Sequence, residues 1–269
     1  GNNTYRYTAA ATADAGETIT FNTTTGATET INLTASVDLS AVNAGAVLTG
    51  LDAITLATTL TGTMLTSQVT GLTLSVTGVA DAATETLALN GTANADTINL
   101  ANVTMANAVV TVAAGAGNDT ITGTAAADTI TAGAGADTVT GGTGNDVIVI
   151  GNTDSGITVA AADSVVGFAT GADTLSMGLA GVDAAGATEN YDEAGAAVAD
   201  FAAALAAANN QLAVLNGNTV TTAASLYNFQ WDATNGYLFE DTDSDGDADQ
   251  VIVLVGVTGA TFAHSDIVA

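Results

Sequence analysis

Four aspartates recur at nine-residue intervals in the middle of the chain. Each ends a Gly- and Ala-rich stretch, and an apolar β-branched residue follows two positions later. The aspartates are Asp119, Asp128, Asp137 and Asp146, and the apolar residues are Ile121, Ile130, Val139 and Ile148. Carboxylates and the carbonyl groups of glycine-rich turns are oxygen ligands that suit calcium. The pattern therefore predicts several Ca²⁺ ions bound along a repeat.

One such turn cannot supply the six to eight oxygens that surround calcium, so neighbouring turns must share ions. Each unit ends in a three-residue strand whose middle residue points inward. Two units then make one coil, and units two apart stack. We expect Asp119 and Asp137 along one edge, and Asp128 and Asp146 along the other. Ordinary Gly/Asp turns are the alternative, and the strict register of four units argues against it.

The units resemble the nonapeptide repeats of the RTX family, secreted proteins whose repeats form calcium-bound parallel β-rolls. The resemblance implies that the four aspartates supply carboxylate ligands and that glycines of the turns supply carbonyl ligands. These glycines are Gly115, Gly117, Gly133, Gly135, Gly142 and Gly144. The second unit departs from the pattern, because Thr124 and Ala126 stand where Gly is expected. Either residue would strain a backbone with positive φ, which weakens the expected Asp128 edge.

The resemblance covers roughly residues 91–269. An outlying copy of the unit ends in Asp96, out of phase with the other four. Asp163 and Asp173 lie in a segment similar to the family's terminal rung, which implies that they close the last calcium site. Residues 236–257 are similar to the C-terminal hairpin of RTX proteins. The ending Ser265–Ala269 resembles the terminus that type I secretion exporters read.

A second kind of calcium motif lies near the C-terminus. Asp241, Asp243 and Asp245, with Gly246 at the sixth position, fit the start of an EF-hand-like loop. Ile252 stands at the twelfth position, where a bidentate Glu belongs. A calcium site and a solvated acidic hairpin loop are both consistent with this sequence.

The charge of the chain restricts its partners. One Lys or Arg residue, Arg6, stands against 28 acidic residues, for a formal net charge of −27. Such a chain repels nucleic acid and anionic membranes, and divalent cations are its natural counter-charge. The chain has no Cys, and therefore neither disulfides nor thiolate metal sites. We expect further sequence upstream of Gly1, with a cell-surface polysaccharide as its partner.

Short strands of alternating apolar residues fill the first ninety residues, for example at 18–21, 31–33, 54–56 and 72–76. They predict a Thr/Ala-rich β-helix-like region over 1–90. A calcium-binding RTX β-roll follows over 91–176, and a C-terminal cap with the secretion signal over 177–269. The expected fold class is all-β: a parallel β-helix/β-roll solenoid with one short Ala-rich helix and a C-terminal β-hairpin.

Helical spacing of apolar residues places the short helix at about 193–212, with Asp192 as its N-cap. Asn235-Gly236 predicts the type I′ turn of the hairpin.

The sequence lacks the usual catalytic motifs. His264 is the single histidine, and there is no G-x-S-x-G, H-E-x-x-H or Walker A sequence. The acid pair of a glycosidase is compatible with the spacing, but calcium ligation explains the dense Asp clusters better. We therefore expect that the protein is not an enzyme.

Three functions remain. The expected one is a calcium-dependent structural protein of the bacterial cell surface, an S-layer or matrix/filament subunit that assembles with itself outside the cell. The alternative is the C-terminal calcium-folding export module of a larger RTX adhesin or secreted enzyme, whose partner is the type I exporter. Ice binding through Thr ladders such as Thr120/Thr122 is the third, although Val147 and Val149 break the ladder.

Overall fold

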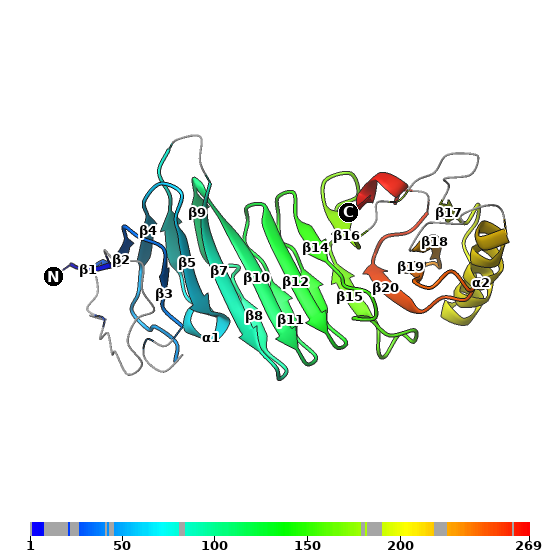
Figure 1. Cartoon of the computed structure of the whole chain (residues 1–269), viewed down its shortest axis with the longest axis horizontal. Coiled ribbons are helices and arrows are strands. Elements are labelled where there is room, and N and C mark those ends of the chain that lie inside the picture. The colour runs from blue at the N-terminus through cyan, green and yellow to red at the C-terminus, as the bar shows by residue number, and fades with distance from the viewer. Residues whose placement is uncertain are drawn as a thin grey trace.

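The molecule is elongated, with the first strands at one end of its long axis and a helix at the other (Figure 1). The structure is a computed structural model. It describes residues 2–7, 21, 27–40, 42, 46–80, 84–178, 181, 190–217, 225–259 and 261–269. Of the strand expected at 18–21, all but Phe21 lies outside these residues.

The described strands form three sheets, here called A, B and C. Sheet A has the order β1 (Asn3–Tyr7), β2 (Glu29–Leu33), β4 (Ala53–Leu56), β6 (Leu74–Thr77) and β9 (Val103–Ala106). Sheet B has the order β3 (Val37–Asp38), β5 (Thr61–Leu65), β7 (Glu85–Thr92), β10 (Ala108–Ala116), β12 (Asp128–Ala134), β14 (Val147–Val149), β16 (Thr174–Ser176) and β21 (Ile267–Val268). Sheet C has the order β8 (Thr97–Asn99), β11 (Thr120–Thr122), β13 (Thr138–Thr140), β15 (Asp163–Val166), β20 (Gln250–Val255), β19 (Asn235–Asp241), β18 (Leu226–Trp231) and β17 (Tyr191–Glu193).

Strand pairing through the repeats is parallel and keeps the apolar residues in line. Ile121 of β11 lies beside Val139 of β13, and Ile130 of β12 beside Ile148 of β14. All four side chains are buried, while the Thr residues beside them alternate to the other face. The chain passes alternately between sheets B and C here, so the turns between them stack along two edges.

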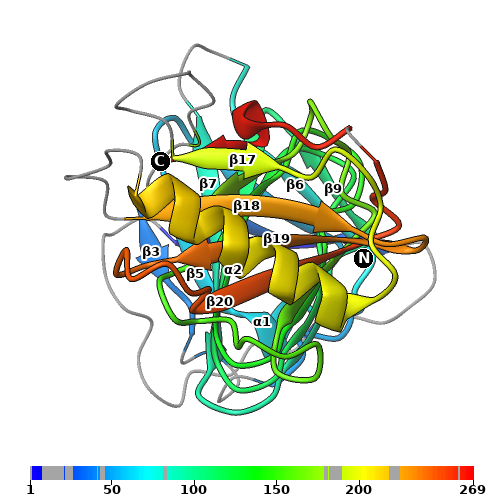
Figure 2. The ribbon, with the colours of Figure 1, turned by 90° about the vertical axis from the view of Figure 1, so that its right-hand side faces the viewer.

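The C-terminal part extends sheet C with antiparallel strands. β18, β19 and β20 pair antiparallel, and β20 pairs in parallel with β15, with Val165 beside Leu254. Helix α2 (Phe201–Gly217) lies across these strands (Figure 2). Its Ala204, Ala208 and Leu212 are fully buried in a cluster with residues of β19 and β20. This part of sheet C is consequently covered on both faces.

Helix α2 begins later than the sequence indicated. Asp200, not Asp192, is its N-cap, because Oδ1 of Asp200 accepts the main-chain N–H of Ala203 (2.9 Å). Asp192 lies in β17 instead. The run of Ala residues after Phe201 has the highest helix propensity, which explains why the helix occupies that stretch.

The predicted fold class is wrong. The described strands form three mostly parallel sheets and not a single β-roll. The described residues hold two α-helices, α1 (Thr66–Val69) and the 17-residue α2, where one short helix was expected. Up to β7 the chain adds strands to sheets A and B, and after β9 it adds them to sheets B and C. β8 is the first strand of sheet C along the chain, and β9 is the last strand of sheet A. The expected hairpin is part of the antiparallel strands β18–β20.

No helix in the described part of the chain is long and apolar enough to cross a membrane.

Candidate metal centre

The turn glycines have the backbone that the repeat requires. Gly115, Gly117, Gly133, Gly135, Gly142 and Gly144 all have positive φ, between 95° and 147°. A Cβ on Gly133 would lie 1.9 Å from the carbonyl oxygen of Gly115, and a Cβ on Gly135 would lie 1.9 Å from that of Gly117. Only glycine therefore allows these turns to stack with their carbonyl groups against the next main chain.

The aspartates of the turns that lead from sheet B into sheet C form a hydrogen-bonded ladder, here called edge 1. Oδ1 of Asp119 accepts the main-chain N–H of Asp96 (2.7 Å). Oδ1 of Asp137 accepts that of Asp119 (2.7 Å), and Oδ1 of Asp163 accepts that of Asp137 (2.9 Å). Each carboxylate thus joins two successive turns through one of its oxygens.

The turns that lead from sheet C into sheet B form the same ladder on the opposite side, edge 2. Oδ1 of Asp146 accepts the main-chain N–H of Asp128 (2.9 Å), and Oδ1 of Asp173 accepts that of Asp146 (3.0 Å). The structure therefore places Asp119 with Asp137, and Asp128 with Asp146, in the stacks that the nine-residue spacing predicts.

The second carboxylate oxygens of four aspartates have no hydrogen-bond donor among the described residues. They are Oδ2 of Asp119, Asp137, Asp146 and Asp163, and all four are buried. An ionised oxygen in this position is strongly unfavourable unless a proton or a cation offsets it. Calcium fits this donor set, because carboxylate oxygens without a donor and main-chain carbonyl groups lie in the same turns.

Burial raises the pKa values of these carboxyl groups. The pKa of Asp163 is raised to about 7 by burial and by the charges of Asp137 and Asp154. The pKa of Asp128 is raised to about 6, again chiefly by burial. Burial also raises the pKa values of Asp119, Asp137 and Asp146, and the charge of a neighbouring aspartate raises each of them further. The electrostatic field of both edges is therefore one that attracts cations.

The second unit of the repeat, with Thr124 and Ala126 in place of Gly, does not have the strained backbone that the sequence predicted. Neither Thr124 nor Ala126 has positive φ. The main-chain N–H of Thr124 donates to Oδ2 of Asp128 (2.6 Å), and its hydroxyl donates to Oδ1 (2.9 Å). Thr92 also donates its main-chain N–H and its hydroxyl to Asp96, at 2.7 and 2.9 Å, but both to Oδ2. A Thr that follows the opening Gly of a unit thus donates to the carboxylate from within the turn.

The two aspartates of the expected terminal rung differ from each other. Asp163 has the buried, unpartnered Oδ2 described above. Asp173 uses both oxygens, because its Oδ2 accepts the main-chain N–H of Ala169 (2.8 Å) while Oδ1 bonds to Asp146. Asp163 therefore fits a shared ion better than Asp173 does.

Asp154 is a candidate ligand that the sequence interpretation missed. Its carbonyl oxygen accepts the main-chain N–H of Gly135 (3.3 Å), as that of Ala134 accepts the N–H of Gly117 (2.9 Å). The loop that begins at Gly151 thus takes the place of the next turn of edge 1. The signal was a fifth Gly/Asp stretch, Gly151 to Asp154, whose Asp falls one position before the nine-residue register.

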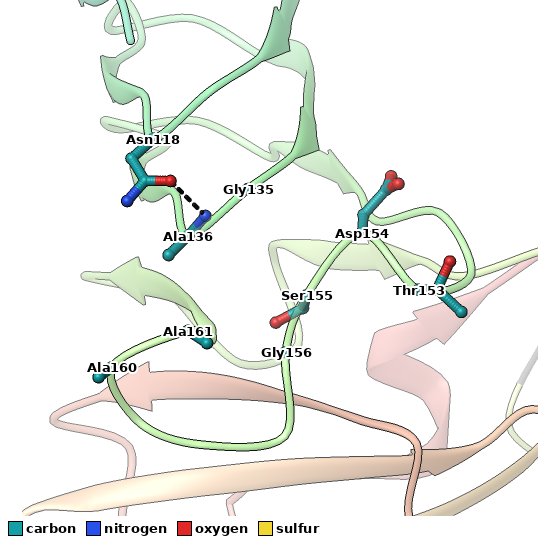
Figure 3. A pocket seen from close by; sticks show the side chains of 9 residues that line it. All are labelled: Asn118, Gly135, Ala136, Thr153, Asp154, Ser155, Gly156, Ala160 and Ala161. Carbon is teal, nitrogen blue, oxygen red and sulfur yellow. Dashed lines mark hydrogen bonds between the residues drawn. The ribbon is translucent and has the colours of Figure 1, made fainter.

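A pocket of about 400 Å³ lies between this loop and the turn that holds Gly135 (Figure 3). Asn118 borders it and accepts the main-chain N–H of Ala136 (3.1 Å) through Oδ1. Ser155 accepts the N–H of Asp163 (2.7 Å) through Oγ, which ends the ladder of edge 1. The pocket is thus the exposed side of the last turn of edge 1.

The acidic loop, residues 241–249, brings together a different set of aspartates from the one that the sequence predicts. Single carboxylate oxygens of Asp241, Asp243 and Asp249 lie within 4.8 Å of one another. Asp245 is not in this group, and its Oδ1 accepts the main-chain N–H of Asp247 (2.9 Å). Asp241 is fully buried, and burial raises its pKa.

Stacked Gly/Asp turns join the parallel strands here, and their donor sets fit calcium-binding repeats. The RTX calcium-binding nonapeptide repeat family matches residues 114–148, in four copies. These are the four units whose turns form the middle of edges 1 and 2. RTX nonapeptide repeats bind calcium, so the predicted calcium binding is supported. No curated protein matches the chain.

Proposed function

We propose that the protein is a calcium-dependent structural component of the bacterial cell surface, an S-layer, matrix or filament subunit, and not an enzyme. The observation that carries this proposal is the set of buried, unpartnered aspartate oxygens at edges 1 and 2. With one Lys or Arg in the chain, their charge is offset by ions from the surroundings. Extracellular calcium-binding modules work at about 10⁻⁴–10⁻³ M calcium, which suits folding after export.

The proposed ligands are those of edges 1 and 2 and of the acidic loop. They comprise the carboxylates of Asp119, Asp137, Asp146 and Asp163, main-chain carbonyl groups of the turns, among them that of Asp154, and the carboxylates of Asp241, Asp243 and Asp249. Asp128 and Asp173 take part less, since donors within their own turns hold them.

Self-assembly is supported by the end of sheet A. β1 is the outer strand there, with β2 as its neighbour among the described strands. Most of its residues are exposed, including Arg6, the chain's one Lys or Arg residue. An exposed edge strand is a template for pairing with another chain. A cation at this edge also complements the acidic remainder of a second copy.

The alternative function is the C-terminal export module of a larger adhesin or enzyme. It is favoured by the C-terminal strand β21, which pairs with β16, with Ile267 beside Leu175. The terminal residues that resemble an exporter signal thus pair with a strand that follows the repeats, and an exporter would read them before calcium folds the chain.

The two functions differ in whether the purified chain assembles with itself in calcium. The purified chain, dialysed into millimolar calcium, is expected to form sheets or filaments visible by negative-stain electron microscopy. Magnesium should replace calcium poorly, because its small octahedral shell accepts few carbonyl ligands. A calcium-folded chain that stays monomeric throughout the millimolar range would favour the export module.

A further inference from the structure

A buried carboxylate lies outside the repeats, at the corner where the chain passes from sheet A into sheet B. Glu85 is the first residue of β7, and its side chain is 0% exposed. Its Oε1 accepts the main-chain N–H of Thr59 (3.0 Å) from the corner between β4 and β5. Its Oε2 is buried and accepts no hydrogen bond from the described residues. Among the described residues, no donor therefore offsets the charge on Oε2 of Glu85.

The unpartnered oxygen lies near a main-chain carbonyl oxygen. A Cβ on Gly78 would lie 2.4 Å from Oε2 of Glu85 and 2.1 Å from the carbonyl oxygen of Asn107. Both oxygens thus border the same space beside Gly78. Two acceptors that share a buried space repel each other unless a proton or a cation lies between them.

The backbone on both sides of Glu85 is held in an uncommon conformation. Thr59 has φ 61° and Asn107, the single residue between β9 and β10, has φ 52°. Non-glycine residues in the left-handed region are strained, and such strain often marks binding sites. Here the N–H of Thr59 donates to one carboxylate oxygen, and the carbonyl oxygen of Asn107 lies near the other.

A second buried carboxylate, at the start of β2, shows how the fold satisfies a buried acid without an ion. Glu29 in sheet A is also 0% exposed, but both of its oxygens accept hydrogen bonds from Nδ2 of Asn3 (3.1 and 3.0 Å). No equivalent amide serves Glu85 among the described residues. Arg6 cannot serve it either, since it lies on β1, at the opposite edge of sheet A from the corner residue Asn107.

We propose that Oε2 of Glu85 and the carbonyl oxygen of Asn107 bind a divalent cation, calcium in preference to magnesium. A carboxylate and a main-chain carbonyl are both ligands that calcium accepts in irregular geometry, whereas magnesium requires a near-ideal octahedron. The site is separate from edges 1 and 2, so it does not depend on the repeats. It fixes the corner that joins β6, β7, β9 and β10, where the chain changes from sheets A and B to sheets B and C.

The stoichiometry of bound calcium tests the proposal. Glu85→Gln keeps the shape and removes the charge, and equilibrium dialysis should find one calcium ion fewer than in the parent chain. Glu29→Gln is the matched control, because its carboxylate is already satisfied, and it should bind as many ions as the parent. An unchanged ion count in Glu85→Gln would overturn the proposal and assign a proton to Glu85.

Crystals of the unmodified chain grown with strontium give a second test that does not depend on the folding of a variant. Anomalous scattering should place a strontium ion between Glu85 and Asn107, besides the ions in the repeat turns. Ions confined to the repeat turns would contradict the proposal, while leaving the calcium role of the repeats intact.

Discussion

Oδ1 of Asp137 accepts the main-chain N–H of Asp119 at 2.7 Å, eighteen residues earlier, while Oδ2 of Asp137 is buried without a donor among the described residues. One oxygen of the side chain thus aligns two turns, and the other is free to bind an ion between them. The same division of roles occurs in Asp163, whose Oδ1 accepts the N–H of Asp137, and in Asp146, whose Oδ1 accepts the N–H of Asp128. Turn stacking and calcium binding therefore depend on the same carboxylates.

Calcium removal should unfold the repeats before the C-terminal part. Without cations, the buried carboxylates of residues 91–176 repel one another, whereas α2 packs on sheet C through apolar contacts. Circular dichroism during an EGTA titration should show loss of β-signal, and hydrogen exchange should rise first in peptides from 91–176. A β-signal that stays constant throughout the titration would contradict the calcium dependence.

Replacing Asp137 should weaken calcium binding more than replacing Asp128. Asp137→Asn keeps the oxygen that aligns the turns and removes the charge beside the ion, so affinity should fall by roughly tenfold or more. Asp128→Asn should change affinity by less than about threefold, because Thr124 already holds that carboxylate. Isothermal titration calorimetry on both variants is the measurement, and equal losses would show that the Thr124 hydrogen bonds do not matter.

Part of this arrangement could be predicted from the sequence. The stacking of Asp119 on Asp137 follows from a strict nine-residue period, since two units make one passage through both sheets. The satisfied state of Asp128 could not be predicted, because it depends on where the hydroxyl of Thr124 points. The sheet order depends on how residues 100–107 pack, which no local period encodes.

The C-terminal turns show the same limit. Gly236 of the expected turn lies in β19 beside Trp231, and the turn is formed instead by Asp232, whose Oδ1 accepts the N–H groups of Thr234 and Asn235 (2.7 and 2.9 Å). In the acidic loop, Asp249 replaces Asp245 because its Oδ2 bonds to Thr242 (2.8 Å) and so returns to the start of the loop. In both cases the hydrogen bonds of an Asp side chain, which the spacing of residues does not encode, set the conformation.

Restoring glycine in the second unit should create a stronger site at edge 2. Thr124→Gly with Ala126→Gly removes the hydroxyl that holds Asp128 and permits the positive φ seen at Gly115 and Gly117. The double variant should bind at least one more calcium ion, or bind calcium about tenfold more tightly, by calorimetry. Thr124→Ser is the control, since it keeps the hydroxyl and should bind as the parent does. No gain in the double variant would mean that edge 2 already binds its ion fully.

The pH dependence of stability should differ between the calcium-free and the calcium-saturated chain. In the calcium-free chain the pKa values of Asp163 and Asp128 are raised to about 7 and about 6, from 3.8 for an exposed Asp. Between about pH 4 and about pH 7, the folded state then binds more protons than the unfolded state. The free energy of unfolding therefore falls as the pH rises through this range. Saturating calcium keeps Asp163 ionised in the folded state, as it is in the unfolded state above about pH 5, so the fall in stability between about pH 5 and about pH 8 should then be smaller. Urea unfolding at several pH values, with EGTA or with excess calcium, measures both curves. A calcium-free chain that becomes more stable as the pH rises over this range would show that these carboxylates are not the groups that calcium neutralises.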